Sequence, residues 1–396
     1  MIRRLTRGMV ALCSAGGLVI SAGVVGVGIG PAGAVPTTLT VGCGQGSYAS
    51  IGAAVGAAGP GNTISVCPGT YTEDVVVPPS KPLSIQGIGN PVVDATGLNN
   101  GVQVLASNSS VKGLVVKNAI GEGILVEGVP GSPITGVTIS GNTVIQNDQG
   151  NPTGAPTTSS PYPECNGSAQ APGDCGEGIH LMVADNSSVV GNQVNHNSGG
   201  ILLTDEFGPT DGNLVAFNNV SNNTLDCGIT VVGHNPGAFS GGLPQPTVGG
   251  VFNNRIAFNV ISGNGVAGQG AGVILATPFP GGAVYNNQVQ NNIMWGNGLA
   301  GVTVHSHAPG QDVNDNTIEG NFIGTNNLDG DPDFFPSVDP STTGVIVAAV
   351  APLSITIEHN LIVNNVYGVW MMAAVTATGT STNLYLNVTM PVFVAP

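Results

Sequence analysis

The chain has 396 residues, of which 7% are charged and 5% aromatic, and its 22 acidic residues against seven basic ones give a net charge of −15. This shortage of Lys and Arg excludes binding to nucleic acid or to an anionic membrane through basic residues, because both affinities depend on neutralising phosphates. The 62 glycines argue against long amphipathic helices and favour many short strands joined by tight turns.

Residues 1–34 are typical of a secretory signal peptide. Three arginines precede an apolar run over Met9–Ile29, and Ala32–Ala34 supplies a cleavage site of small residues. A membrane anchor is the alternative, because about 21 apolar residues can cross a bilayer, but the glycines in the run and its Ala-x-Ala ending favour cleavage. The remaining chain has four basic and 22 acidic residues, a net charge of about −18. We expect it to be secreted, extracellular and without membrane attachment.

Five cysteines follow the leader. In an oxidising exterior Cys43 can pair with Cys67, and Cys165 with Cys175, which leaves Cys227 over. A Cys175–Cys227 disulfide is the competing arrangement, because both residues come just before an expected strand. The sequence leaves this choice open.

The segment 50–87 has an Ala-rich stretch, a Pro-Gly turn, an apolar strand, the turn Pro68–Tyr71 and further strands. This succession resembles the N-terminal segment of secreted right-handed parallel β-helix proteins of bacterial type, the pectate-lyase-like superfamily. The resemblance implies an all-β chain over residues 35–396, a single solenoid domain with a short capping helix around residues 51–58.

From residue 120 onward, a Gly followed by alternating apolar residues recurs, at intervals as short as 22 to 24 residues. That interval is one coil of a parallel β-helix, and wider intervals imply inserted loops. We expect these loops at residues 148–176, 234–250 and 327–343, so that inserted loops flank both edges of one sheet. In the β-helix proteins that this layout resembles, the channel between such loops holds an extended glycan. The repeats begin at Gly123, Gly178, Gly200, Gly228, Gly272, Gly301, Gly344 and Gly368.

Asparagine forms a second repeat, because pairs of Asn five residues apart surround apolar residues. Asn tolerates the left-handed corner between two strands, and stacked Asn side chains can hydrogen-bond along a solenoid. A structural role is therefore expected for the pairs Asn142/Asn147, Asn192/Asn197, Asn218/Asn223, Asn259/Asn264, Asn292/Asn297, Asn316/Asn321 and Asn360/Asn365.

Titratable residues gather on one face of the Gly-marked strands. The first and third residues after each Gly are apolar and should point inward, so the second and fourth point outward. His180, the pair Asp205 and Glu206, and His234 then lie on three consecutive rungs, with about 5 Å between neighbours. Carboxylates this close raise imidazole pKa values and prepare acid/base chemistry. We take Asp205, Glu206 and His234 as the candidate catalytic centre.

Other outward residues are expected to line subsites for substrate: Glu127, His180, Thr204, Thr230, His305 and His307. The two carboxyl groups that flank a glycosidic bond lie about 5 to 9.5 Å apart. The expected distance from Glu127 to Asp205 or Glu206 is near the upper limit of this range. Three further acidic residues are expected at the opposite edge of the Gly-marked sheet, about 15 to 20 Å from Asp205 and Glu206: Glu122, Glu177 and Asp226. The alternative is that Asp205 and Glu206 merely begin a solvated turn.

The usual chemistries of the resembling enzymes are not fully present. Polyuronate lyases typically use Arg or Lys, but Arg255 is the only Arg after the leader and is expected away from the Gly-marked sheet. The polygalacturonase motifs, such as Gly-His-Gly and Arg-Ile-Lys, are missing. We therefore expect a monomeric, carbohydrate-active protein, a hydrolase or an atypical lyase, that acts on a neutral or weakly charged polysaccharide. The alternative is a non-catalytic glycan-binding or structural solenoid.

One acidic segment could bind a cation. Asp329, Asp331 and Asp333 alternate around Gly330, and carboxylate oxygens are the ligands that Ca²⁺ prefers. The segment lacks the spacing and the terminal Glu of an EF-hand, so a plain polar turn is the alternative. Calcium is the one cofactor that the sequence suggests.

Overall fold

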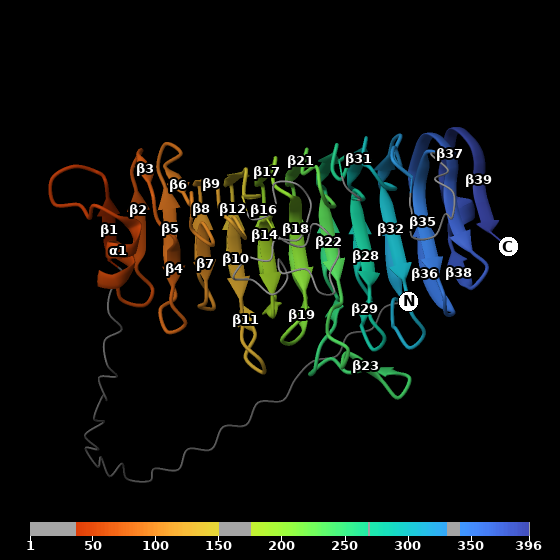
Figure 1. Ribbon diagram of the computed structural model, residues 1–396, viewed down its shortest axis with the longest axis horizontal. Coiled ribbons are helices and arrows are strands. Elements are labelled where there is room, and N and C mark those ends of the chain that lie inside the picture. Colours follow the sequence, from red (N-terminus) through yellow and green to blue (C-terminus); the bar gives the residue numbers. More distant parts are fainter. Residues whose placement is uncertain (1–36, 150–175, 268–269, 331–340, 396) are drawn as a thin grey trace, which may run out of the picture. The chain divides into compact units, whose positions relative to one another are not determined.

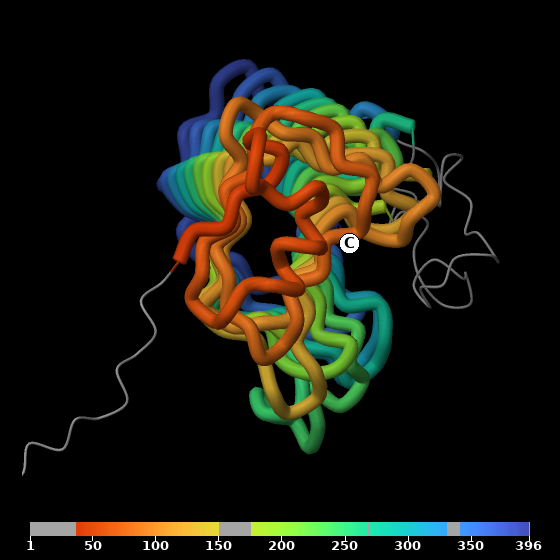
Figure 2. The backbone as a smooth tube through the Cα atoms, turned by 90° about the vertical axis from the view of Figure 1, so that its left-hand side faces the viewer, coloured from red at the N-terminus to blue at the C-terminus, as the bar shows by residue number. Residues whose placement is uncertain are grey.

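The computed structural model describes residues 37–149, 176–267, 270–330 and 341–395. Within these residues it confirms an all-β solenoid with one α-helix, α1 (Ile51–Ala57). Figure 1 shows the strands of successive coils side by side, and Figure 2 shows the coils lying behind one another. The signal peptide prediction lies outside the described residues. No helix in the described part of the chain is long and apolar enough to cross a membrane.

The Gly-marked sheet consists of parallel strands from successive coils. Its strands are β4 (Val75–Val77), β7 (Val102–Val104), β10 (Ile124–Glu127), β14 (Glu177–Met182), β18 (Gly199–Thr204), β22 (Ile229–Val232), β28 (Val273–Thr277), β32 (Val302–Ser306) and β35 (Thr343–Ala349). The inward residues Ile124, Ile179, Ile201 and Ile229 pair rung by rung and are fully buried. Their burial explains the apolar positions of the repeat.

A second sheet of twelve parallel strands forms another side of the coil. Its strands are β1 (Thr38–Val41), β2 (Thr63–Val66), β5 (Ser84–Gly87), β8 (Ser110–Lys112), β12 (Thr138–Ser140), β16 (Ser188–Val190), β20 (Leu214–Ala216), β26 (Arg255–Ala257), β30 (Gln288–Gln290), β33 (Asn316–Glu319), β36 (Leu353–Glu358) and β38 (Val375–Thr378).

The third side, which we call the narrow sheet, has strands of only two or three residues over most of its length. They are β3 (Thr70–Tyr71), β6 (Val92–Asp94), β9 (Val115–Lys117), β13 (Thr143–Ile145), β17 (Gln193–Asn195), β21 (Asn219–Ser221), β27 (Val260–Ser262), β31 (Ile293–Trp295) and β34 (Phe322–Ile323). The long strands β37 (Leu361–Met372) and β39 (Leu384–Ala395) join it to the Gly-marked sheet.

Short strands form the edge that follows the Gly-marked sheet. They are β11 (Ile134–Thr135), β15 (Ala184–Asp185), β19 (Thr210–Asp211), β25 (Val251–Phe252), β29 (Val284–Tyr285) and the antiparallel pair β23 (Phe239–Ser240) and β24 (Leu243–Pro244). The pair β23–β24 lies inside the expected insertion 234–250 and projects from this edge (Figure 1). The other two insertions lie mostly outside the described residues.

Ladders of buried asparagine hold successive coils together. Asn192 donates both its backbone N–H and its side-chain amide to Oδ1 of Asn218, at 2.9 and 3.0 Å, and accepts the same two bonds from Asn142. The ladder residues themselves do not have a positive φ. The left-handed residue is the one before most of them, as in Gly191 and Phe217, so the ladder Asn is selected for its hydrogen bonds. A third ladder runs Asn213, Asn254, Asn287 and Asn316, and of these residues the sequence predicted only Asn316.

The N-terminal cap is closed by local contacts. Ser50 caps α1 by accepting the Ala53 N–H, and Lys81 donates to two carbonyls at the other end of the helix. The predicted Cys43–Cys67 disulfide is present. Cys165 and Cys175 lie outside the described residues, and Cys227 is buried with a free thiol.

Candidate functional site

The register places the predicted outward residues as expected, but it does not leave them open to solvent. His180 pairs with Leu202, and Thr204 lies between Met182 and Val232. His180 and Thr204 are almost fully buried, and several outward neighbours form small apolar clusters. Side chains on rungs about 4.8 Å apart cover one another. The outward face is therefore a packed surface with polar groups set into it.

The centre of the site is a contact between the side chains of Glu206 and His234, on adjacent coils. Glu206 Oε1 lies 2.7 Å from His234 Nδ1, and the two side chains are 19% and 5% exposed. Burial raises the pKa of Glu206, but the charge and hydrogen bond of His234, with smaller contributions from His180 and Thr204, outweigh it and lower the pKa to about 2. Glu206 is thus a carboxylate at neutral pH that holds the imidazole ring in place.

Asp205 lies beside this pair but contacts the backbone of the inserted loop. Its Oδ1 accepts the N–H groups of His234 and Asn235 at 2.6 and 3.0 Å, and its Oδ2 accepts the Gly250 N–H at 2.5 Å. The side chain is fully buried, and burial raises its pKa to about 6 although these N–H groups act in the opposite direction. Asp205 thereby fastens both ends of the 234–250 loop.

His180 connects the two edges of the sheet. Its Nε2 lies 2.8 Å from Thr204 Oγ1, and its Nδ1 lies 3.4 Å from Glu122 Oε1. His180 therefore contacts Glu122, at the edge that was expected about 15 to 20 Å from Asp205 and Glu206, and also Thr204 on the next coil. The strands are only four to six residues long here, so one imidazole spans the space between Glu122 and the Glu206 side of the sheet.

Two further acidic residues lie buried at the same edge of the Gly-marked sheet as Glu122. Glu177 is fully buried, and a Cβ on Gly199 would overlap its carboxylate, so Gly199 provides the space that this carboxylate fills. Burial raises the pKa of Asp226, which accepts a hydrogen bond from Thr230 Oγ1 at 3.3 Å. The predicted subsite residue Thr230 is thus bound to an acid within the protein.

The remaining predicted subsite residues lie apart from Glu206 and His234. Glu127 accepts a hydrogen bond from Gln103 Nε2 at 2.8 Å. His305 pairs with Ala276, which pairs with Val232, so it lies two rungs beyond the site as expected. Its ring packs edge-on against His307, whose Nδ1 lies 3.1 Å from the Thr277 carbonyl oxygen.

The predicted calcium site lies mostly outside the described residues. Asp329 is exposed, and Asp331 and Asp333 lie outside the described residues. A different group has metal-binding spacing within the part of the chain that is described: Glu319, Glu358 and His359 on the second sheet. The sequence did not suggest it, because Glu319 and Glu358 come together only through strand register.

Comparisons with known proteins agree with the fold. A family model described as periplasmic copper-binding protein (NosD) matches residues 105–293, slightly less than half of the chain. No curated protein gives a significant match. Among solved structures, an alginate lyase from Paenibacillus sp. str. FPU-7 is similar with a TM-score of 0.55 and 14% identity, over 89% of this chain and 99% of the lyase. The pectate lyase Pel9A has a TM-score of 0.51 and 15% identity, over 88% of this chain and 78% of its own.

The acidic group on the second sheet does not fit a copper site. Copper prefers imidazole and sulfur ligands, whereas the group on the second sheet supplies two carboxylates and one exposed imidazole. Cys227 is no substitute, because burial, together with the charge of Asp226, raises the pKa of its thiol well above the usual range. Its sulfur also accepts the Ala271 N–H at 3.1 Å.

Proposed function

We propose that this right-handed parallel β-helix binds an extended, neutral or weakly charged polysaccharide outside the cytoplasm and hydrolyses it. The observation that carries this proposal is the 2.7 Å contact between Glu206 and His234. An imidazole that is held by an ionised carboxylate is a suitable general acid or base.

Hydrolysis is favoured over elimination by the charge of the protein. Elimination from a uronate needs cationic groups that neutralise the sugar carboxylate and the charge that develops beside it. Arg255 lies on the second sheet, where its Nε donates to Gln290 at 3.2 Å. The polar groups around Glu206 and His234 are carboxylates, imidazoles and hydroxyls, which suit the protonation of a glycosidic oxygen.

In the proposed reaction, His234 Nε2 donates a proton to the glycosidic oxygen as its bond to the anomeric carbon breaks. Glu206 stays ionised and stabilises the charged imidazole. A water molecule attacks the anomeric carbon and releases its proton to solvent. Glu127 does not receive this proton directly, because it lies three rungs from His234, roughly 14 Å away, beyond the separation of about 5 to 9.5 Å between paired catalytic groups in glycosidases. Asp205, which contacts only backbone N–H groups in the described contacts, acts as a positioning residue for His234.

A glycan panel tests this proposal. The purified protein is incubated with neutral and uronate polysaccharides, and new reducing ends and unsaturated products are both measured. We expect new reducing ends without unsaturated products, and a 10²- to 10⁴-fold loss of turnover in Glu206→Gln and His234→Ala. Glu358→Gln, a matched change on the second sheet, should leave turnover unchanged. Full turnover in Glu206→Gln would contradict the assignment.

A non-catalytic glycan-binding solenoid is the second candidate. The burial of His180, Thr204 and Asp205 favours it, because buried polar residues can simply complete the packing of the coil. Binding of a polysaccharide without any new reducing ends would support this candidate and reject hydrolysis.

A further inference from the structure

Two phenylalanines on a corner of the coil have a backbone conformation that does not suit them. Phe217 and Phe258 precede the ladder residues Asn218 and Asn259, and both have a φ of 57°. The left-handed region is uncommon for bulky residues, and Asn or Gly normally occupies it. On neighbouring coils the same corner holds Gly191 and Asn291. The two Phe residues are therefore strained replacements for residues that the fold accepts easily.

Burial does not compensate for this strain. Phe217 is 62% exposed and Phe258 is 44% exposed. Their rings are parallel within 5°, with centroids 5.1 Å apart. Strained residues that the core does not require mark candidate functional positions.

The stack of rings ends at an open space. Phe258 covers one face of Phe217, and the other face is directed toward the coil of Gly191, about 4.8 Å away. A Cβ placed on Gly191 or on Gly141 would meet nothing within 4 Å. A ring-shaped group of a ligand can therefore continue the stack over these glycines.

Amide side chains cover the narrow sheet beside this space. Asn219 donates to Gln193 Oε1 at 3.0 Å, and Asn195 Oδ1 lies 2.8 Å from His196 Nδ1. These residues belong to β17, β21 and the corner that follows β17, on the same coils as Gly191 and Phe217. Amides supply both donors and acceptors, which is what sugar hydroxyl groups require.

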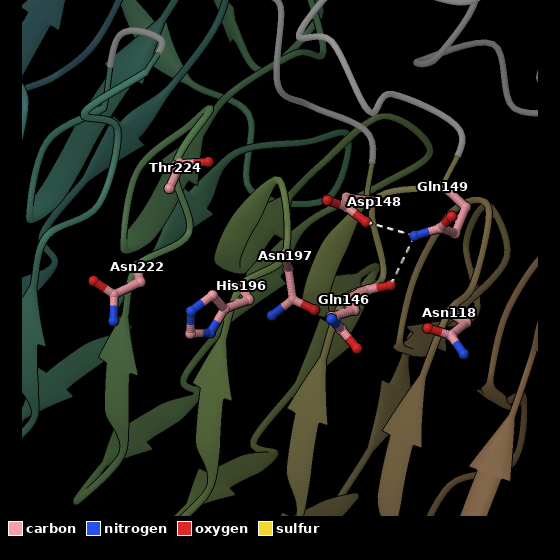
Figure 3. A pocket seen from close by; sticks show the side chains of 8 residues that line it. All are labelled: Asn118, Gln146, Asp148, Gln149, His196, Asn197, Asn222 and Thr224. Carbon is pink, nitrogen blue, oxygen red and sulfur yellow. Dashed lines mark hydrogen bonds between the residues drawn. The ribbon is translucent and has the colours of Figure 1, made fainter.

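A polar cavity of about 340 Å³ lies on the same coils, at the corner that follows the strands of the narrow sheet. Figure 3 shows Asn118, Gln146, His196 and Asn222 in a row at the ends of neighbouring strands, with Asp148 and Gln149 above them. Gln149 Nε2 donates to Asp148 Oδ1 at 2.8 Å. From Phe217 to Asn222 the chain advances five residues, roughly 16 Å at 3.3 Å per residue.

We propose that this face of the narrow sheet, from Phe217 to the cavity at His196, is a second binding surface for a neutral glycan. A pyranose ring stacks its C–H groups on the open face of Phe217, and the amide side chains and the cavity bind the hydroxyl groups of the following sugars. The acidic chain, with a net charge of −15, disfavours polyanions. This surface is separate from Glu206 and His234, and it retains the protein on its polymer.

The test uses Phe217→Asn and Phe258→Asn, alone and together, because Asn suits the left-handed backbone and the variants should fold at least as well as the parent. Binding of cellohexaose, xylohexaose and chitohexaose is measured by calorimetry, and retention is measured in gels that contain the parent polysaccharides. We expect the double variant to lose at least tenfold in affinity for the hexaose that binds best, whereas Phe217→Tyr, which keeps the ring, stays within twofold of the parent.

Two outcomes would overturn the proposal: no binding of any of the three hexaoses, or affinity in the double variant within twofold of the parent. Failure of this surface can be told apart from failure of the proposed hydrolysis. Glu206→Gln should lose turnover and keep its retention in polysaccharide gels, and the Phe double variant should lose retention and keep its turnover on short oligosaccharides.

Discussion

Replacing Glu206 with Gln should remove a specific part of the pH dependence of stability. Contacts in the folded protein lower the pKa of Glu206 from 4.5 to about 2. One pKa unit corresponds to about 1.4 kcal/mol, so the ionised carboxylate stabilises the folded state by about 3 kcal/mol. Because the folded pKa is the lower one, this contribution is present above about pH 4.5 and is lost as the pH falls toward 2.

The assay is urea unfolding of parent and variant at several pH values between 2 and 7. The difference in the free energy of unfolding should be about 3 kcal/mol at pH 7 and should shrink to within about 1 kcal/mol at pH 2. Taking the difference cancels the titration of the other carboxyl groups. Glu358→Gln serves as the control and should give a small difference at every pH. A difference for Glu206→Gln that is constant with pH would show that the pair with His234 does not hold the carboxylate in its ionised form.

Other changes test the ladders, the loop and the buried groups. Asn218→Ala should destabilise the protein by about 3 to 5 kcal/mol in urea unfolding, because it leaves the buried donors of Asn192 and the carbonyl of Val189 without their partner; a cost below 1 kcal/mol would refute the role of the ladder. Asp205→Ala should release the 234–250 loop and make it a site of rapid limited proteolysis, and an unchanged cleavage pattern would argue against the anchoring role. Asp185→Asn should stabilise the protein by about 2 kcal/mol at pH 8 and have no effect at pH 4, since burial and the neighbouring Asp211 raise the pKa of Asp185 to about 7, and stability tied to its protonated form is lost as the pH rises through that value. Cys227 should resist thiol reagents in the folded protein and react only on unfolding, as measured by the rate of labelling.

The sequence alone determined the architecture and the direction of the side chains. A strict alternation after each Gly predicts which residues of a strand face inward, and the register of the coils follows from the same repeat. The outward positions of His180, Thr204 and His305 were therefore predicted correctly. The sequence also predicted correctly that the coils of Glu206 and His234 are neighbours. The Asn pairs were recognised from their spacing of five residues, although their hydrogen bonds, and not a left-handed backbone, explain the choice of Asn.

Tertiary structure decided which of these groups are already bound within the protein. The third ladder, through Asn213 and Asn254, joins residues 41 positions apart, and the Phe217–Phe258 stack has the same separation. Asp205 binds Gly250, 45 residues away. No local pattern encodes these contacts, because the lengths of the inserted loops vary from coil to coil and the sequence separation of stacked residues varies with them. Strand register brings such residues to neighbouring coils, and the closing of each loop then decides whether a carboxylate meets a backbone N–H, an imidazole or solvent.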